Sequence, residues 1–502
     1  MNKKILILLV SLVIFGSSCS KFLAVNEVNP NNASAVPPKL LLPAALNNIA
    51  VMLNTPGNYE FVYLWYGLWS ISSGYSQPTA LVQYKLLNSS YQGPFNSSYA
   101  FGQNLTEIEK ASTDPKDAYY LATANILKVL IMANLVDCWG DVPYSEAFKS
   151  GDGILKPKYD KQQAIYDDLI LKLDAAIKLI QGAPADANAI PASSDIMYGG
   201  NMTLWAKFAN TLKLRMLVHQ SGMASRDTYI KAAIATTSST GYIGVGQSAL
   251  VNPGYVQSAG KMNPFYERYY SAAGTQQSDG VTYHNAGRDA VDFMNSAGDP
   301  RIGRFFNPYS GTSYAGNFLG QAAPPLTAAN TSKLGYSATN GKGYMVGTFD
   351  KSCPILTDFE SLLIQAEATE RGYLTGTTAK ALYNSAIAQS FVYMGLVAAD
   401  GTAYATSDKA SVNYDLASNK LNLILTQKWI SLNGIAPIEI WTDYRRSGIP
   451  SFLHYSEDAA KENATPPVRL FYPQREIDYN NDNVVAVGAI NAFTSKIFWQ
   501  NR

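Results

Sequence analysis

Charged side chains are scarce in this sequence, and histidine and cysteine are scarcer still. Asp, Glu, Lys and Arg make up 15% of the 502 residues, below the usual ~25%, and the formal net charge is +1. Because the chain has no basic excess, we expect no nucleic-acid partner. The 3 histidines (His219, His284 and His454) form no H-E-x-x-H motif, and we expect no metal and no cofactor.

The 3 cysteines are too few for a disulfide framework. Cys138 lies at the end of an apolar helical pattern, where a buried free thiol is the common state. A bridge between Cys138 and Cys353 stays open as an alternative in an oxidising compartment. Cys19 has a different setting, directly after an apolar segment at the N-terminus.

Residues 1–18 are typical of an export signal. Lys3 and Lys4 precede the apolar run 5–15, which is too short to span a bilayer as a helix of ~20 residues. Small residues follow, and then Cys19, an arrangement that resembles the lipobox of bacterial lipoproteins, where this cysteine becomes the lipidated N-terminus. An ordinary cleaved signal with an incidental cysteine is the alternative. Residues 19–39 are polar and rich in Asn and Pro, and they predict a linker.

Apolar residues recur with helical spacing through much of the remaining chain, so the sequence predicts a mainly α fold with little β. Four stripes carry this prediction, within residues 127–138, 169–180, 205–216 and 379–394. Two long segments, about 72–99 and 236–348, interrupt the pattern with Gly, Ser, Asn, Pro and Tyr. Their aromatic content argues against disorder, so we expect ordered, inserted loops.

Paired carboxylates are the remaining route to an enzyme, because a glycosidase needs two of them at the right separation. Asp137 and Asp141 lie four residues apart, and Glu360, Glu367 and Glu370 share a predicted helix. Neighbouring Gly140 and Pro143 indicate instead that the two aspartates end a helix and order a turn. Pairing with Arg371 or with cations of other helices is the simpler interpretation of the glutamates. We therefore expect no enzyme.

Several motifs resemble the SusD/RagB family of outer-membrane lipoproteins, specifically the SusD-like branch of Bacteroidetes. They are, in chain order, Cys19 with the following Ser-Lys-Phe-Leu, Asn29-Pro30-Asn31, Gly140-Asp-Val-Pro-Tyr-Ser-Glu-Ala147, Trp205 to Arg215, Gln427-Lys428-Trp429, and Trp441-Thr-Asp-Tyr-Arg-Arg-Ser-Gly448. Trp205 and Trp441 are expected core anchors, and Arg215, Arg445 and Arg446 are expected to bind carboxylates or carbonyl ends. The motifs describe a scaffold rather than an active site.

The resemblance implies a scaffold of tetratricopeptide-like helical hairpins over residues 40–502 with the two loop insertions. It also implies a lipid anchor at Cys19 and a place in the outer membrane, facing the cell exterior. Relatives capture a nutrient, commonly an oligosaccharide, and pass it to a SusC-like TonB-dependent transporter. A glycoside hydrolase on an α-rich scaffold and a peptide-binding helical adaptor are the alternatives.

A protein that captures glycans needs flat rings for the apolar sugar faces and polar groups for the hydroxyls. Tyrosine supplies both, and the chain has 33 of them. The candidate ligand-binding residues are the tyrosines of the two loops, namely Tyr75, Tyr84, Tyr91, Tyr266, Tyr269, Tyr283 and Tyr309. Packing of these rings onto the scaffold is the alternative for each one.

Overall fold

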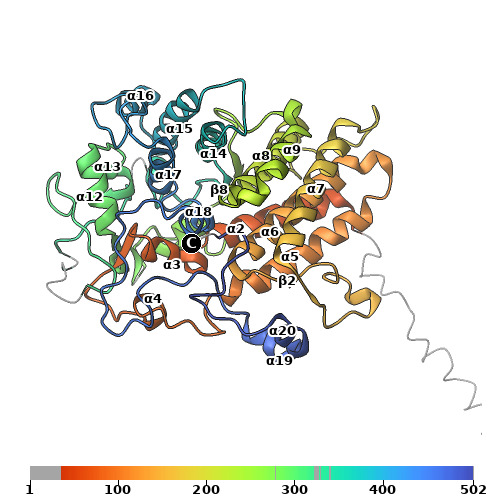
Figure 1. Cartoon of the computed structure of the whole chain (residues 1–502), viewed down its shortest axis with the longest axis horizontal. Helices are drawn as coiled ribbons and strands as arrows, with labels where there is room; N and C mark the ends of the chain where they lie inside the picture. Colours follow the sequence, from red (N-terminus) through yellow and green to blue (C-terminus); the bar gives the residue numbers. More distant parts are fainter. Residues whose placement is uncertain (1–35, 278, 322–326, 328, 338–340, 501–502) are drawn as a thin grey trace, which may run out of the picture. The chain divides into compact units, whose positions relative to one another are not determined.

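Helices form most of the chain in the computed structural model, which describes residues 36–277, 279–321, 327, 329–337 and 341–500 (Figure 1). The predicted signal peptide and Cys19 lie outside the described residues. The first half contains α2 (Pro38–Asn54), α3 (Pro56–Trp65), α4 (Thr79–Val82), α5 (Gln92–Ala111), α6 (Ala118–Trp139), α7 (Gln162–Gln181), α8 (Met202–His219) and α9 (Asp227–Ala235). The second half contains α10 (Pro264–Tyr269), α11 (Gly280–Tyr283), α12 (Arg288–Ala297), α13 (Ile302–Phe305), α14 (Asp358–Glu370), α15 (Ala379–Tyr393), α16 (Ala398–Ala405), α17 (Lys420–Ser431), α18 (Pro437–Ser447), α19 (Gln474–Tyr479) and α20 (Asn481–Val487).

Consecutive helices pack against each other as hairpins. The run α5–α6–α7–α8 forms one such array and α14–α15–α16 forms another, as the orange-to-green and teal helices of Figure 1 show. From Pro38 onward the chain is one compact unit. The predicted mainly α fold of tetratricopeptide-like hairpins is therefore confirmed, and the four predicted stripes lie on α6, α7, α8 and α15.

Helix α6 lies at the centre of the first array and is buried along almost its whole length. Among the described residues, Pro115–Trp139 is the one helical stretch that is long and apolar enough to cross a membrane. In its most apolar 18 residues, 83% are buried inside the protein. Burial on all sides explains its apolar composition, so it is a core helix. Gly140 ends it with a φ of 78°, a conformation that favours glycine.

In the part of the chain that the structure describes, short strands form three small sheets. The largest has the order β1-β5-β7-β6, from β1 (Trp69–Ile71), β5 (His284–Ala286), β7 (Lys333–Leu334) and β6 (Phe306–Asn307). The others pair β2 (Val142–Pro143) with β3 (Tyr159–Asp160) and β4 (Ala249–Val251) with β8 (Cys353–Leu356). The described pairs between these strands are antiparallel.

The two predicted loop insertions contain more regular structure than the sequence indicated. In segment 72–99 the irregular part stops at Tyr91, because residues 92–99 belong to α5. The irregular part also contains the short helix α4. The described residues of segment 236–348 form α10 to α13 and six short strands or single 3₁₀ turns. Most of these elements are only a few residues long and display no full period of apolar residues; α12, with 10 residues, is the exception.

Both buried cysteines, Cys138 and Cys353, are free thiols, which excludes a bridge between them in this structure.

Candidate functional site

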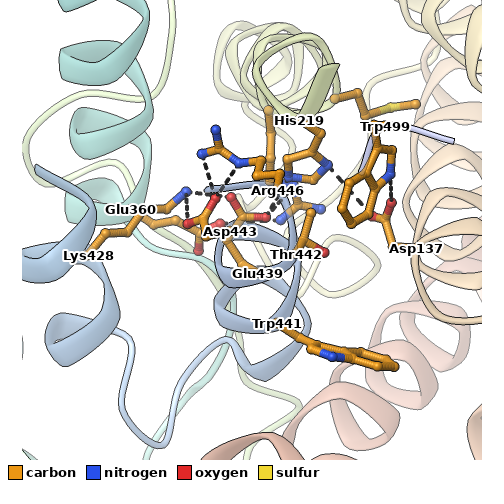
Figure 2. A network of polar contacts seen from close by, with 12 residues as sticks. Asp137, His219, Glu360, Lys428, Glu439, Trp441, Thr442, Asp443, Arg446 and Trp499 are labelled. Carbon is orange, nitrogen blue, oxygen red and sulfur yellow. Dashed lines mark hydrogen bonds and ion pairs between the residues drawn. The ribbon is translucent and has the colours of Figure 1, made fainter. Parts of the chain in front are cut away.

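A buried network of charged side chains joins α6, α8, α14, α17 and α18 (Figure 2). Glu439 of α18 receives Lys428 Nζ at 2.5 Å on Oε1 and His219 Nε2 at 3.0 Å on Oε2. Arg446 of the same helix donates two parallel hydrogen bonds to Glu367 of α14, at 2.7 and 2.6 Å. The network therefore ties together helices that are far apart in the sequence.

The aspartates considered for hydrolysis have structural partners. Asp137 Oδ1 accepts a hydrogen bond from Trp499 Nε1 at 3.1 Å. Asp141 accepts one from the backbone N–H of Gln162 at 3.0 Å and forms an ion pair with Lys161 at 2.8 Å. Asp141 therefore orders the turn after α6, as expected, whereas Asp137 lies within α6 and joins it to the C-terminal segment through Trp499.

The electrostatics of the network also favour a structural role. Burial alone would raise the pKa of Glu367, but Arg446 and Arg371 hold it at about 2. Burial raises the pKa of Glu360 to about 7, against the opposing effect of Arg215. An adjoining cavity of about 40 Å³, lined in part by Asp137 and Arg215, has room for a few waters, whereas small-molecule pockets take ~300–1,000 Å³.

A different cluster lies at one end of the β1–β5 pair. Ile71 pairs with His284, so the chain leaves β1 and enters β5 at the same end of the sheet. The Ser72 N–H donates to the Tyr283 carbonyl at 2.9 Å, which extends this pairing. Tyr75 and Tyr283 consequently meet edge to face, with ring centroids 5.3 Å apart and planes at 88°. The hydroxyls of Tyr75 and Thr282 are 2.5 Å apart.

Three charged residues surround these rings. Arg268 of α10 binds Asp279 bidentately, with both N–O distances 3.1 Å, and this hydrogen bonding lowers the pKa of Asp279. Glu60 of α3 has a side chain 17% exposed, and burial raises its pKa. Tyr91 lies close enough to Glu60 and Tyr283 that both raise its pKa, after the larger effect of burial.

We call this cluster the Tyr75–Tyr283 site; its residues are Glu60, Tyr75, Tyr91, Arg268, Asp279, Thr282 and Tyr283. All seven side chains belong to residues of intermediate exposure. The site offers ring surface, hydroxyl groups, a guanidinium and two carboxylates. Such a set can stack on an apolar ligand face and can hydrogen-bond a polar rim.

A family model described as "Starch-binding associating with outer membrane" matches residues 30–473. This chain belongs to the SusD-like family. The family resemblance found in the sequence motifs is thereby confirmed. A search of curated proteins found no match.

Solved structures of SusD homologues have the same fold. A SusD-like protein from Bacteroides thetaiotaomicron is 23% identical with a TM-score of 0.73, over 93% of this chain and 99% of that one. A chitin-binding SusD homologue from Flavobacterium johnsoniae is 22% identical with a TM-score of 0.74, over 92% and 98%. A homologue from Bacteroides uniformis is 21% identical with a TM-score of 0.71, over 92% and 99%. At these identities the likeness shows the fold alone.

The structure of this SusD-like protein brings four of the predicted tyrosines together. Tyr75, Tyr91 and Tyr283 lie in the Tyr75–Tyr283 site and are half-buried. Tyr269 lies behind them and is 0% exposed, with its hydroxyl 3.0 Å from His284 Nδ1. It therefore binds His284, the residue after Tyr283, and offers no surface to a ligand.

The other three predicted tyrosines lie elsewhere. Tyr84 is 0% exposed, and its hydroxyl accepts a hydrogen bond from the Ser456 N–H at 2.8 Å, so it anchors a loop. Tyr266 is 4% exposed and stacks on Tyr270, with centroids 5.3 Å apart. Tyr309 is 41% exposed and free to meet a ligand, but it has no contact with the Tyr75–Tyr283 site among the described ring and polar interactions.

The charged members of the site are not among the residues predicted from the sequence. Glu60, Arg268 and Asp279 stand in segments of low charge density, and Arg268 lies within the tyrosine-rich second insertion. A charge within an otherwise uncharged aromatic segment is the signal that could have selected Arg268 and Asp279. Glu60 sits in α3, between aromatic residues, and no local pattern separates it from a solvated helix position.

Proposed function

We propose that this SusD-like protein is a lipoprotein of the outer membrane that captures an oligosaccharide at the Tyr75–Tyr283 site, without turning it over. In this proposal Cys19 carries the lipid, the body faces the cell exterior, and the ligand passes to a SusC-like TonB-dependent transporter. The description of the family, which combines starch binding with the outer membrane, supports the general function.

The observation that carries the proposal is the meeting of half-exposed rings from two separate insertions. Tyr75 and Tyr283 are 208 positions apart in sequence (283 − 75), and the register of β1 and β5 places them in edge-to-face contact. Core packing does not require rings that remain partly open to solvent. Their hydroxyls and the nearby Arg268 supply the polar contacts that sugar hydroxyls need.

Two of the similar structures are named as chitin-binding proteins, so oligomers of N-acetylglucosamine are the first probes to use. Titration calorimetry of the mature chain with chito-, malto- and xylo-oligosaccharides should give binding to one class. The substitution Tyr283→Ala should weaken it by about 1–3 kcal/mol, as truncation of a central aromatic anchor does. Tyr479→Ala on α19, at a ring that is 71% exposed, is the matched control and should leave affinity unchanged.

Equal affinity of wild type, Tyr75→Ala and Tyr283→Ala for the bound oligosaccharide would remove the Tyr75–Tyr283 site from the proposal. Release of new reducing ends during the titration would favour the glycoside hydrolase alternative. Binding of peptides and of no glycan would favour the helical adaptor.

A further inference from the structure

When Glu60 is ionised, the Tyr75–Tyr283 site has a net negative charge. Arg268 is bound bidentately by Asp279, so this pair is neutral as a whole. Among the described residues, none donates a hydrogen bond to the Glu60 carboxylate, whose ion-pair contact is His284 Nε2 at 3.4 Å. Arg268 favours the charged form of Glu60 by a longer-range attraction, which Asp279 opposes. The three charges that act on Tyr269 and Tyr283 are Glu60, Arg268 and Asp279, which sum to −1.

His284 does not compensate for this charge. Its side chain is 0% exposed, and burial, with a further contribution from Arg268, lowers its pKa to about 3, so the ring is neutral near pH 7. The Nδ1 atom pairs with the Tyr269 hydroxyl at 3.0 Å. The Nε2 atom is buried without a hydrogen-bond partner and is the ring nitrogen nearest Glu60. Nε2 is therefore an unsatisfied buried polar atom beside the Glu60 carboxylate, whereas buried polar atoms are normally satisfied.

Aromatic rings stand beside the same carboxylate. Burial is the main cause of the raised pKa values of Tyr91 and Tyr283, and the Glu60 charge is the second cause. The two phenols therefore lie near that carboxylate. Rings attract a cation through their faces, and a carboxylate adds a charge-assisted hydrogen bond to an ammonium group. In the described part of the chain, no group of three His, Cys, Asp or Glu side chains could hold a metal ion. An organic ammonium fits this donor set better than calcium, which takes six to eight oxygens.

We propose that the ligand of this site is an oligosaccharide that bears at least one free, protonated amino sugar, with its ammonium group bound by Glu60. This inference rests on the proposed glycan-binding function and narrows it to a chemical class. Neutral regions of the glycan then contact the Tyr75 and Tyr283 rings, and the amino group supplies the selectivity.

The test compares two oligosaccharides of equal length by calorimetry at about pH 6, where the amines are protonated: a hexamer of glucosamine and a hexamer of N-acetylglucosamine. One charge-assisted hydrogen bond corresponds to about tenfold in affinity, so the glucosamine hexamer should bind about tenfold more tightly. In Glu60→Gln this ratio should fall to within about twofold. Glu107→Gln, the same change at a side chain on α5 that is 48% exposed, should keep the wild-type ratio.

Salt gives a measurement that does not depend on the variant folding. The wild-type preference should shrink when NaCl rises from about 50 to about 500 mM, because a partly exposed ion pair is screened. A ratio near one in the wild type, or a ratio that Glu60→Gln leaves intact, would overturn the inference and leave the proposed function standing. Absence of binding by every oligosaccharide would instead overturn the proposed function. Tighter binding of trilysine than of the glucosamine hexamer would assign the ammonium site to peptides and overturn the inference.

Discussion

The pair formed by Arg446 and Glu367 gives the sharpest prediction about the scaffold. Both side chains are nearly inaccessible, at 2% and 0% exposure, and two parallel hydrogen bonds join them. The substitution Glu367→Gln keeps the shape and removes the charge, so Arg446 is left with Asp443 as its carboxylate partner. Removing one member of a buried ion pair costs about 3–5 kcal/mol, a large part of a typical total stability of about 5–15 kcal/mol.

The pKa of Glu367 leads to a similar magnitude. Its ordinary pKa is 4.5 and its folded pKa is about 2, and one pKa unit corresponds to about 1.4 kcal/mol, so the carboxylate contributes about 3 kcal/mol near pH 7. A depressed pKa means that this contribution is present above pH 4.5 and is lost as the pH falls towards 2. The difference between wild type and Glu367→Gln should therefore be largest near neutrality and should shrink in acid.

Urea unfolding followed by circular dichroism, at pH 7 and at several lower values, measures both quantities. The comparison must be between variant and wild type, because Glu360, with its raised pKa of about 7, makes the wild type lose stability as the pH rises from 4.5 to 7. Glu370→Gln, at an exposed position of the same helix, is the control and should cost less than about 1 kcal/mol. A cost below about 1 kcal/mol for Glu367→Gln at pH 7 would refute the reasoning.

Two other predictions concern the site and the anchor. In Gly287→Ala the new Cβ would lie 2.2 Å from the Gly67 carbonyl oxygen, so the β1–β5 end should shift, stability should fall by about 1–3 kcal/mol and glycan affinity should also fall. In the control Gly57→Ala the new Cβ has nothing within 4 Å, so stability and affinity should not change. Equal unfolding curves for Gly287→Ala and wild type would contradict this prediction. Cys19→Ala should abolish incorporation of labelled palmitate in cells, while Cys138→Ala should not, because Cys138 is buried; label retained by Cys19→Ala would exclude the anchor.

The helical scaffold could be predicted from the sequence because each helix buries one face over several turns. The stripes of α7, α8 and α15 span three or more turns, and tertiary packing agrees with them. The sheet β1-β5-β7-β6 could not be predicted in this way. Its strands have two or three residues, which is too short for alternation to appear. Its β1–β5 pairing also joins segments more than 200 residues apart.

The candidate site was predicted by segment and not by residue. Tyr75 and Tyr84 stand in the same predicted segment, on either side of α4, yet Tyr84 is fully buried and Tyr75 is half-buried. The difference comes from Ser456, which binds the Tyr84 hydroxyl from 372 positions away. Local composition carries no information about such a partner, so tyrosine content could indicate the right loops and could not select the right rings.

The contrast between two glutamates separates scaffold from site in this protein. Glu439 is 4% exposed and receives Lys428 and His219, and its pKa is held well below the ordinary value despite burial. Glu60 is also largely buried, yet the described residues leave its carboxylate without a hydrogen bond and its pKa is raised. On α14 and α18 each buried glutamate has a cation beside it. Among the described residues Glu60, beside the half-buried rings, has no such partner, and burying an ionised carboxylate without one costs free energy. A bound cation offsets that cost, and this is the physical reason to look for the charge partner of Glu60 in the ligand.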